Sequence, residues 1–207
     1  VNGKLFFVTG STAASNITYM SAINVNVDLA EQNGISVSDL YAHVENGTWT
    51  LDLLYSLSKD IYTDLNENGE KDIADSFGCV LNEGYTRNLI YTAEYFPIRK
   101  NAEDGRLEVN PIFDSDKFLD YVQELHGYAY GNTGFFFSGD TAVVYIRNIF
   151  TEGRSVLYLG GINTFERLDN SFELALLPLP RENPKENPGS IEYYSKTATD
   201  NPCVAIF

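Results

Sequence analysis

The segment 64–75 constrains the fold most, because its polar side chains follow a fixed spacing around one glycine. Alternate side chains on a turning segment converge on a common point, and the glycine permits the sharp turn that brings them together. Oxygen donors on this spacing are typical of an EF-hand-like loop that binds Ca²⁺. The expected ligands are Asp64, Asn66, Asn68, the backbone carbonyl of Glu70, Asp72 and Asp75, with Gly69 at the turn.

The charge of this loop bears on its affinity for calcium. The closing position, which usually holds a bidentate Glu, holds the shorter Asp75, and two of the early ligands are neutral Asn residues. Both features weaken binding, so we expect a structural Ca²⁺ site suited to calcium-rich extracellular fluid. The alternative is an acidic surface turn that joins two elements and holds no metal.

Composition argues against some classes of partner. The chain has 207 residues and a formal net charge of −15, and no cluster of basic residues offsets this charge. The balance argues against nucleic acids and anionic membrane surfaces as partners. Cys79 and Cys203 lie far apart and outside any metal or redox spacing, so we expect two small buried side chains. Whether they pair as a disulfide stays open.

Apolar periodicity predicts strands that alternate with helices, which is typical of an α/β fold with a sheet flanked by helices. Strands are expected at 4–8, 19–27, 77–81, 155–159 and 172–177. Helices are expected at 28–32, 86–95 and 163–168, and after caps at Ser38, Thr50, Asp114 or Ser115, and Asp140 or Thr141.

Three local expectations follow from single residues. Gly127 is expected to end the helix that precedes it, as glycines often do at helix ends. The pair Gly160 and Gly161 is expected to form a tight turn. Trp49 lies at the beginning of a predicted helix, and we expect it to pack in the core.

The sequence offers no positive evidence for catalysis. Acidic residues are so frequent that no carboxylate pair stands out, and no metalloprotease, nucleophile-elbow or phosphate-loop pattern occurs. The two histidines, His43 and His126, are expected in structural roles. We therefore expect a protein that is not an enzyme.

Five segments, in order along the chain, resemble a known family. They are residues 2–8 (NGKLFFV), 26–35 (NVDLAEQNGI), 47–52 (GTWTLD), 76–78 (SFG) and 150–161 (FTEGRSVLYLGG). Their order and spacing are similar to those of the extracellular solute-binding proteins of ABC importers, the family typified by the maltodextrin-binding protein. No segment is specific by itself, but together they cover most of the chain.

The resemblance implies a fold and a function. Members of the family hold a solute, most often a carbohydrate, between two α/β lobes that are joined by hinge strands, and then dock on a membrane permease. Residues 1–207 would form one lobe of the type II periplasmic-binding-protein-like fold, with both termini near the hinge crossovers and the other lobe absent. The implied protein is a monomer that captures an oligosaccharide. It would lie in the periplasm or, lipid-anchored, on the extracellular face of a bacterial membrane.

The resemblance also places a ligand site. Gly161, Asn163 and Thr164 would face the cleft, where small glycines let a ligand approach the backbone and Asn163 can donate to and accept from sugar hydroxyls. The family often has an aromatic residue after the glycine pair, where this chain has Asn163, with Phe165 beyond it. The further candidates for contact with a sugar ring are Tyr158, Tyr194 and Tyr19.

Two other interpretations remain open. A calcium-stabilised carbohydrate-active enzyme domain would need an acid/base pair of carboxylates and would hydrolyse its ligand. A dockerin-type interaction module would need two calcium loops of this kind, whereas this chain has one.

Overall fold

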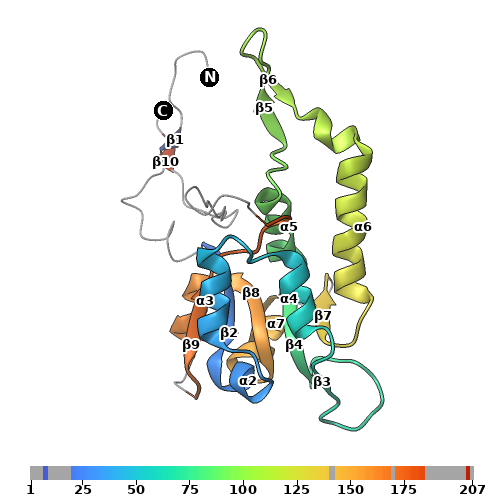
Figure 1. Cartoon of the computed structure of the whole chain (residues 1–207), viewed down its shortest axis with the longest axis vertical. Helices are drawn as coiled ribbons and strands as arrows, with labels where there is room; N and C mark the ends of the chain where they lie inside the picture. The colour runs from blue at the N-terminus through green and yellow to red at the C-terminus, as the bar shows by residue number, and fades with distance from the viewer. Residues whose placement is uncertain (1–6, 9–19, 140–142, 169–170, 185–203, 206–207) are drawn as a thin grey trace.

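Strand β8 (Ser155–Gly161) lies inside a six-stranded mixed sheet (Figure 1). All 7 of its residues are buried. It runs parallel to β4 (Ser76–Asn82) on one side and antiparallel to β2 (Ser21–Asn26) on the other. The computed structural model describes residues 7–8, 20–139, 143–168, 171–184 and 204–205. The other strands of the sheet are β9 (Leu174–Leu177) beside β2, and β3 (Tyr62–Thr63) and β7 (Phe135–Ser138) beside β4.

Helices cover both faces of this sheet, which confirms the predicted α/β class with a sheet flanked by helices. α7 packs on one face, and helices α3 to α6 pack on the other. None of the helices in the described part of the chain is both long and apolar enough to cross a membrane. The helices are α2 (Val27–Gln32), α3 (Val37–Glu45), α4 (Leu51–Ser58), α5 (Glu83–Thr92), α6 (Asp116–Tyr130), α7 (Val143–Thr151) and the 3₁₀ helices η1 (Pro111–Asp114) and η2 (Ile162–Arg167).

Two small antiparallel ladders complete the described structure. β5 (Ile98–Lys100) and β6 (Leu107–Val109) form a hairpin that projects from the body of the molecule (Figure 1). The pair Asp104 and Gly105, which is typical of hairpin connections, lies between the two strands. β1 (Phe7–Val8) pairs with β10 (Val204–Ala205), and only these two residues of the strand expected at 4–8 are described.

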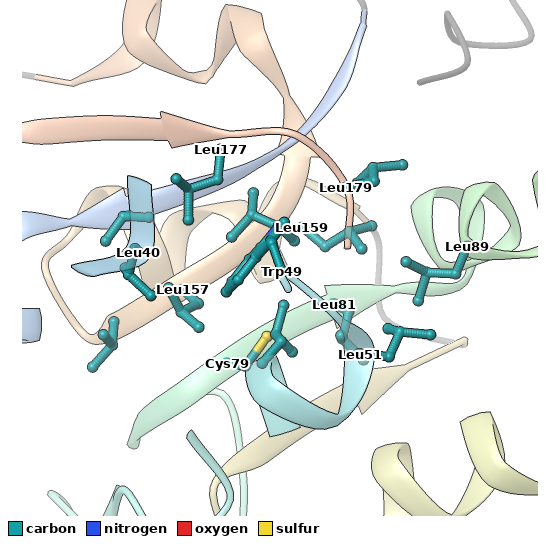
Figure 2. Packing of buried hydrophobic residues seen from close by; sticks show 14 of the residues in the cluster. Leu40, Trp49, Leu51, Cys79, Leu81, Leu89, Leu157, Leu159, Leu177 and Leu179 are labelled. Atoms are coloured by element: carbon teal, nitrogen blue, oxygen red, sulfur yellow. The ribbon is translucent and has the colours of Figure 1, made fainter. Parts of the chain in front are cut away.

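The larger core lies on the face that α3, α4 and α5 cover, and Trp49 is at its centre (Figure 2). The indole is fully buried, and its Nε1–H donates a hydrogen bond to the carbonyl of Pro178 at 2.8 Å. Leu157 and Leu159 point into this core, whereas Tyr158, between them, packs on the α7 side. This alternation is the period of a β-strand. The expected core position of Trp49 is confirmed.

Cys79 belongs to the same core. It is fully buried, and burial raises the pKa of its thiol far above the ordinary value. A small apolar side chain was expected there, and the structure confirms it. Cys203 lies outside the described residues, so the pairing of the two cysteines stays open.

The structure corrects the starts of two predicted helices. α3 is capped by Ser36 instead of Ser38, because Ser36 Oγ accepts a hydrogen bond from the backbone N–H of Asp39. α5 begins at Glu83 instead of residue 86, because Asn82 Oδ1 accepts from the backbone N–H of Gly84. In both cases an earlier polar side chain satisfies the free N–H groups of the first turn.

Two glycine expectations are also corrected, and the short strands β3, β5, β6 and β7 were not predicted. α6 continues through Gly127 to Tyr130, because Gly127 does not adopt the positive φ with which a glycine ends a helix. Gly160 and Gly161 are the last residues of β8 and do not form a tight turn, since both pair with β2. β7 was not predicted, because its run of three Phe residues is too short to show a period. The caps expected at Asp140 or Thr141 lie outside the described residues.

Candidate functional site

The parallel pairing of β4, β7 and β8 brings three strand ends to one edge of the sheet. Their last residues are Asn82, Ser138 and Gly161. β2 is antiparallel to β8 and begins at the same edge, where Ser21 pairs with Gly161. In open α/β sheets, ligands bind outside the carboxyl ends of the strands. This edge is therefore the candidate binding site.

Two half-buried polar side chains converge on the backbone of Gly161. A Cβ added at Gly161 would lie 2.4 Å from Asn163 Oδ1 and 3.4 Å from the hydroxyl of Tyr85. Only glycine leaves space for both groups there. Asn163 comes from η2 and Tyr85 from the first turns of α5, so residues far apart in the sequence share one surface.

Tyr85 was not predicted as a site residue. The sequence signal that would have found it is Asn82, which ends an apolar strand and caps the next helix. Residues just after such a strand end face the edge at which ligands bind. Helix 86–95 was predicted to begin too late, so Tyr85 was assigned to a connection instead of to the first turn of α5.

The backbone at Gly161 is held in place from three sides. Asn24 Nδ2, fully buried in β2, donates to the carbonyls of Tyr158 at 3.3 Å and Gly161 at 3.5 Å. Thr164 Oγ1 donates to the Gly161 carbonyl at 2.7 Å, and the backbone N–H of Ile162 donates to the Met20 carbonyl at 2.9 Å. The conformation of the Gly161 backbone is therefore fixed by hydrogen bonds from its own chain.

These contacts change the roles expected for two residues. Thr164 is 2% exposed and its hydroxyl is used by the Gly161 carbonyl, so it positions the backbone instead of facing a ligand. Tyr158 is 1% exposed, and its ring lies under Gly160 and beside Phe150. Burial raises the pKa of the Tyr158 hydroxyl. The structure thus places Tyr158 beneath the site.

The remaining aromatic candidates have different outcomes. Tyr19 and Tyr194 lie outside the described residues. Phe165 follows Asn163 by two positions and is 50% exposed, so its ring offers an apolar face near the edge. Neither Gly161 nor Asn163 lines the groove between α5 and α6 or the apolar cavity between α4, α5 and α6.

The segment 64–75 forms a loop between β3 and β4 that is closed by Asp75. Asp75 is fully buried, and its carboxylate accepts hydrogen bonds from the backbone N–H groups of Leu65 and Asp72 and from the hydroxyl of Tyr62. Burial and the hydrogen bond to Asp75 raise the pKa of Tyr62 to about 12, so the phenol stays protonated and donates. These bonds hold both ends of the loop together.

Inside the loop, short-range hydrogen bonds turn the chain. Asp64 Oδ2 accepts from the backbone N–H of Gly69 at 2.9 Å, and Asn66 and Asn68 each accept from the N–H two residues further on. The side-chain NH₂ groups of the same two Asn residues donate to Asp72 Oδ2, at 3.3 and 2.9 Å. Asp64 Oδ1 is buried and has no hydrogen-bond partner among the described residues.

The donors of this loop are compatible with a hard cation. Among the described residues, no group of three or more His, Cys, Asp or Glu side chains is placed to hold a metal ion by itself. A carboxamide can also present its oxygen, so Asn66 and Asn68 could supply uncharged donors if they turned away from Asp72. With the unpartnered oxygen of Asp64, the oxygen-only set fits Ca²⁺ better than a transition metal.

Three solved structures share this fold. They are the GacH receptor of Streptomyces glaucescens GLA.O, UspC of M. tuberculosis, and an ABC transporter solute-binding protein from Thermotoga lettingae TMO bound with α-D-tagatose. GacH is 14% identical with a TM-score of 0.55, over 87% of this chain and 41% of that chain. UspC is 20% identical with a TM-score of 0.53, over 79% and 42%. The Thermotoga protein is 16% identical with a TM-score of 0.52, over 87% and 42%.

These likenesses define the fold of the chain. It is folded like part of an ABC-transporter solute-binding protein, and it spans about two fifths of the length of the structures it resembles. No family model matches the sequence, and no curated protein matches it.

The surroundings of two glycines predict opposite effects of a Gly→Ala substitution on stability, because Gly160 is closely packed and Gly127 is not. Gly160→Ala should lower the free energy of unfolding by about 1–3 kcal/mol, because the new Cβ would lie 2.2 Å from the buried ring of Tyr158. Gly127→Ala should raise the free energy of unfolding by about 0.5–1 kcal/mol, because Gly127 lies inside α6, where alanine has the higher helix propensity. A Cβ added at Gly127 would have no other atom within 4 Å. Urea denaturation followed by circular dichroism measures both. A Gly160→Ala protein as stable as the unsubstituted chain would contradict the packing described.

Proposed function

We propose that this chain is part of an extracellular solute-binding protein of an ABC importer and that it binds a carbohydrate at the sheet edge around Gly161. One observation carries the proposal: the half-buried Asn163 carboxamide and Tyr85 hydroxyl converge beside the Gly161 backbone at the carboxyl ends of parallel strands. The likeness to the solved structures supports a solute-binding fold, and the hydrogen-bonding groups at the sheet edge support a carbohydrate as the ligand.

The edge matches the chemistry of a sugar. Sugar hydroxyls both donate and accept hydrogen bonds, and the Asn163 carboxamide and the Tyr85 hydroxyl can do the same. The flat, apolar face of a pyranose ring packs well on an aromatic ring, which Phe165 offers at 50% exposure. Asn24 and Thr164 hold the Gly161 carbonyl, so binding should cost little conformational entropy at this part of the backbone.

We further propose that the chain supplies one wall of the binding cleft. It would be one lobe of a two-lobe, type II protein. The second lobe would close over the ligand, as ligands of such proteins are buried by hinge closure. The chain by itself should therefore bind weakly. The proposed solute is an oligosaccharide, and the proposed partner is the permease of an importer. The protein would be a monomer that lies in the periplasm or is lipid-anchored outside the cell.

Binding without turnover is part of this proposal. A glycosidase places two carboxylates on either side of the bond it breaks. At the Gly161 edge, the groups that converge are an amide and a phenol. No specific observation favours the alternative of a carbohydrate-active enzyme.

The first test is ligand-observed NMR with a panel of glucose, maltotetraose, cellotetraose and xylotetraose. At least one member should receive saturation from the protein and be recovered unchanged. Asn163→Ala should weaken that binding about threefold to tenfold, because one hydrogen bond to a sugar hydroxyl is lost. Asn46→Ala, at the exposed end of α3, is the matched control and should have no effect. No transfer to any sugar, or a hydrolysed sugar, would overturn the proposal.

We also propose that the loop 64–75 holds a structural Ca²⁺ ion. Asp64, Asn66, Asn68, Asp72 and Asp75 would supply side-chain oxygens, and Glu70 would supply its backbone carbonyl. The buried, unpartnered Oδ1 of Asp64 supports this proposal, since a buried carboxylate oxygen without a partner is costly. The ion would pin the connection from β3 to β4, away from the Gly161 edge.

Thermal melts in EDTA, Ca²⁺ or Mg²⁺ test the calcium proposal. Ca²⁺ should raise the melting temperature by roughly several degrees over EDTA, because a ligand that binds only the folded state stabilises it. Mg²⁺ should raise it much less, because it demands a tighter octahedral shell. Asp64→Asn should abolish the rise, whereas Asp60→Asn, exposed and outside the loop, should keep it. An equal response to both ions, or none, would make this segment an ordinary acidic turn.

A further inference from the structure

Arg147, in the middle of α7, carries a positive charge that has no partner in the described part of the chain. Its side chain is half-buried, and its Nε–H is enclosed without a hydrogen-bond acceptor among the described residues. Nor does any of the ion pairs between described residues include Arg147. A buried donor without an acceptor costs free energy, so this arginine calls for an explanation.

A second half-buried arginine, Arg154, shows the ordinary arrangement. Its Nη1 donates to the carbonyls of Ile73 and Asp75 at 2.7 and 2.8 Å, and its Nη2 donates to Glu152 at 2.7 Å. Carboxylates are not scarce in this chain, which has 29 Asp and Glu residues. Arg147 is therefore an exception, and its guanidinium is available to a ligand.

The topology directs Arg147 toward the sheet edge where β8 ends. β7 and β8 both run parallel to β4, so α7, which joins them, begins at the carboxyl edge of the sheet and runs away from it. Helical side chains lean toward the N-terminus of their helix, which here is the end nearer to that edge. Burial raises the pKa of the Tyr158 hydroxyl, and the charge of Arg147 opposes this rise, as a cation near the phenol does.

Two phenols join Arg147 to the Gly161 edge. The ring of Tyr158 lies 5.5 Å from that of Phe150 in α7 and 6.4 Å from that of Tyr85, measured between centroids. The Tyr85 hydroxyl in turn lies 3.4 Å from the point where a Cβ on Gly161 would be. Among the described residues the Tyr158 hydroxyl and the Arg147 Nη groups also lack a hydrogen-bond partner, but they are not fully enclosed. They can therefore meet a ligand.

We propose that Arg147 and Tyr158 form an oxyanion site beside the Gly161 edge, which takes a carboxylate or a phosphate carried by the solute. The planar guanidinium donates two parallel hydrogen bonds to either group, and the phenol donates a third. This inference rests on the proposed function and adds to it that the solute is anionic, a sugar acid or a sugar phosphate. The net charge of −15 repels anions from the protein as a whole, so binding of such a solute needs a local positive group.

The test is an NMR titration of the 207-residue chain with sugars that differ only at C6. The probes are glucose and galactose, their uronates and their 6-phosphates. At least one anionic form should bind roughly tenfold more tightly than its neutral parent, because charge-assisted hydrogen bonds form. A preference for the uronate identifies the group as a carboxylate, and a preference for the 6-phosphate identifies it as a phosphate.

Substitutions assign this preference to Arg147. Arg147→Gln should abolish it and leave the neutral sugar unchanged, whereas Arg147→Lys should keep part of it, since the charge remains without the planar fork. Tyr158→Phe keeps the buried ring and should weaken binding of the anionic form about threefold, because one hydrogen bond is lost. Arg106→Gln, which removes the same charge at the exposed turn of the β5–β6 hairpin, is the matched control and should keep the full preference.

The outcomes separate this inference from the function on which it rests. If neither these sugars nor any neutral tetrasaccharide binds, the proposed function and the oxyanion site are both overturned. If neutral sugars bind but no anionic form binds more tightly than its parent, the oxyanion site alone is overturned. The same follows if Arg147→Gln weakens neutral and anionic sugars equally, because Arg147 then acts only through the fold. Circular dichroism checks that each variant is folded.

Discussion

The pairing of β8 with its two neighbours is the constraint on which the rest of the structure depends. Because β8 is parallel to β4, the ends of both strands reach one edge, and because it is antiparallel to β2, the start of β2 reaches the same edge. The strand is buried throughout, so its register is fixed by the packing of Leu157 and Leu159 on one face and Tyr158 on the other. The position of Gly161 follows directly from this register.

Local signals were enough to predict much of the fold. β4 and β8 contain apolar runs, and β2 alternates apolar residues with Asn24 and Asn26. Thr50 caps α4 as expected, since its Oγ1 accepts from the backbone N–H of Leu53. These local signals failed where contacts between different elements determine the structure. Gly160 and Gly161 look like a turn in the sequence, but pairing with β2 extends them. Gly127 looks like a helix end, yet packing of α6 against β7 continues past it.

At the candidate site too, some residues could be predicted from the sequence and others could be placed only by the tertiary fold. Gly161 and Asn163 were predicted, and the structure brings them together with Tyr85, which only the tertiary fold could place. Tyr158 could not be told from an exposed aromatic in the sequence, because its burial depends on how α7 and β4 pack around its ring, which only the tertiary fold decides. The loop 64–75 is the opposite case, since its turns are made by side chains that bond within two to six residues.

The central claim is that a carbohydrate binds at the edge where β8 ends. The most direct measurement is a map of backbone amide chemical shifts of the isotope-labelled chain as maltotetraose, cellotetraose or xylotetraose is added. The account predicts the largest changes at Ser21, Gly84, Tyr85, Gly161 and Asn163, with the loop 64–75 unchanged. Changes confined to another face of the sheet, or no changes with any of these sugars, would contradict it.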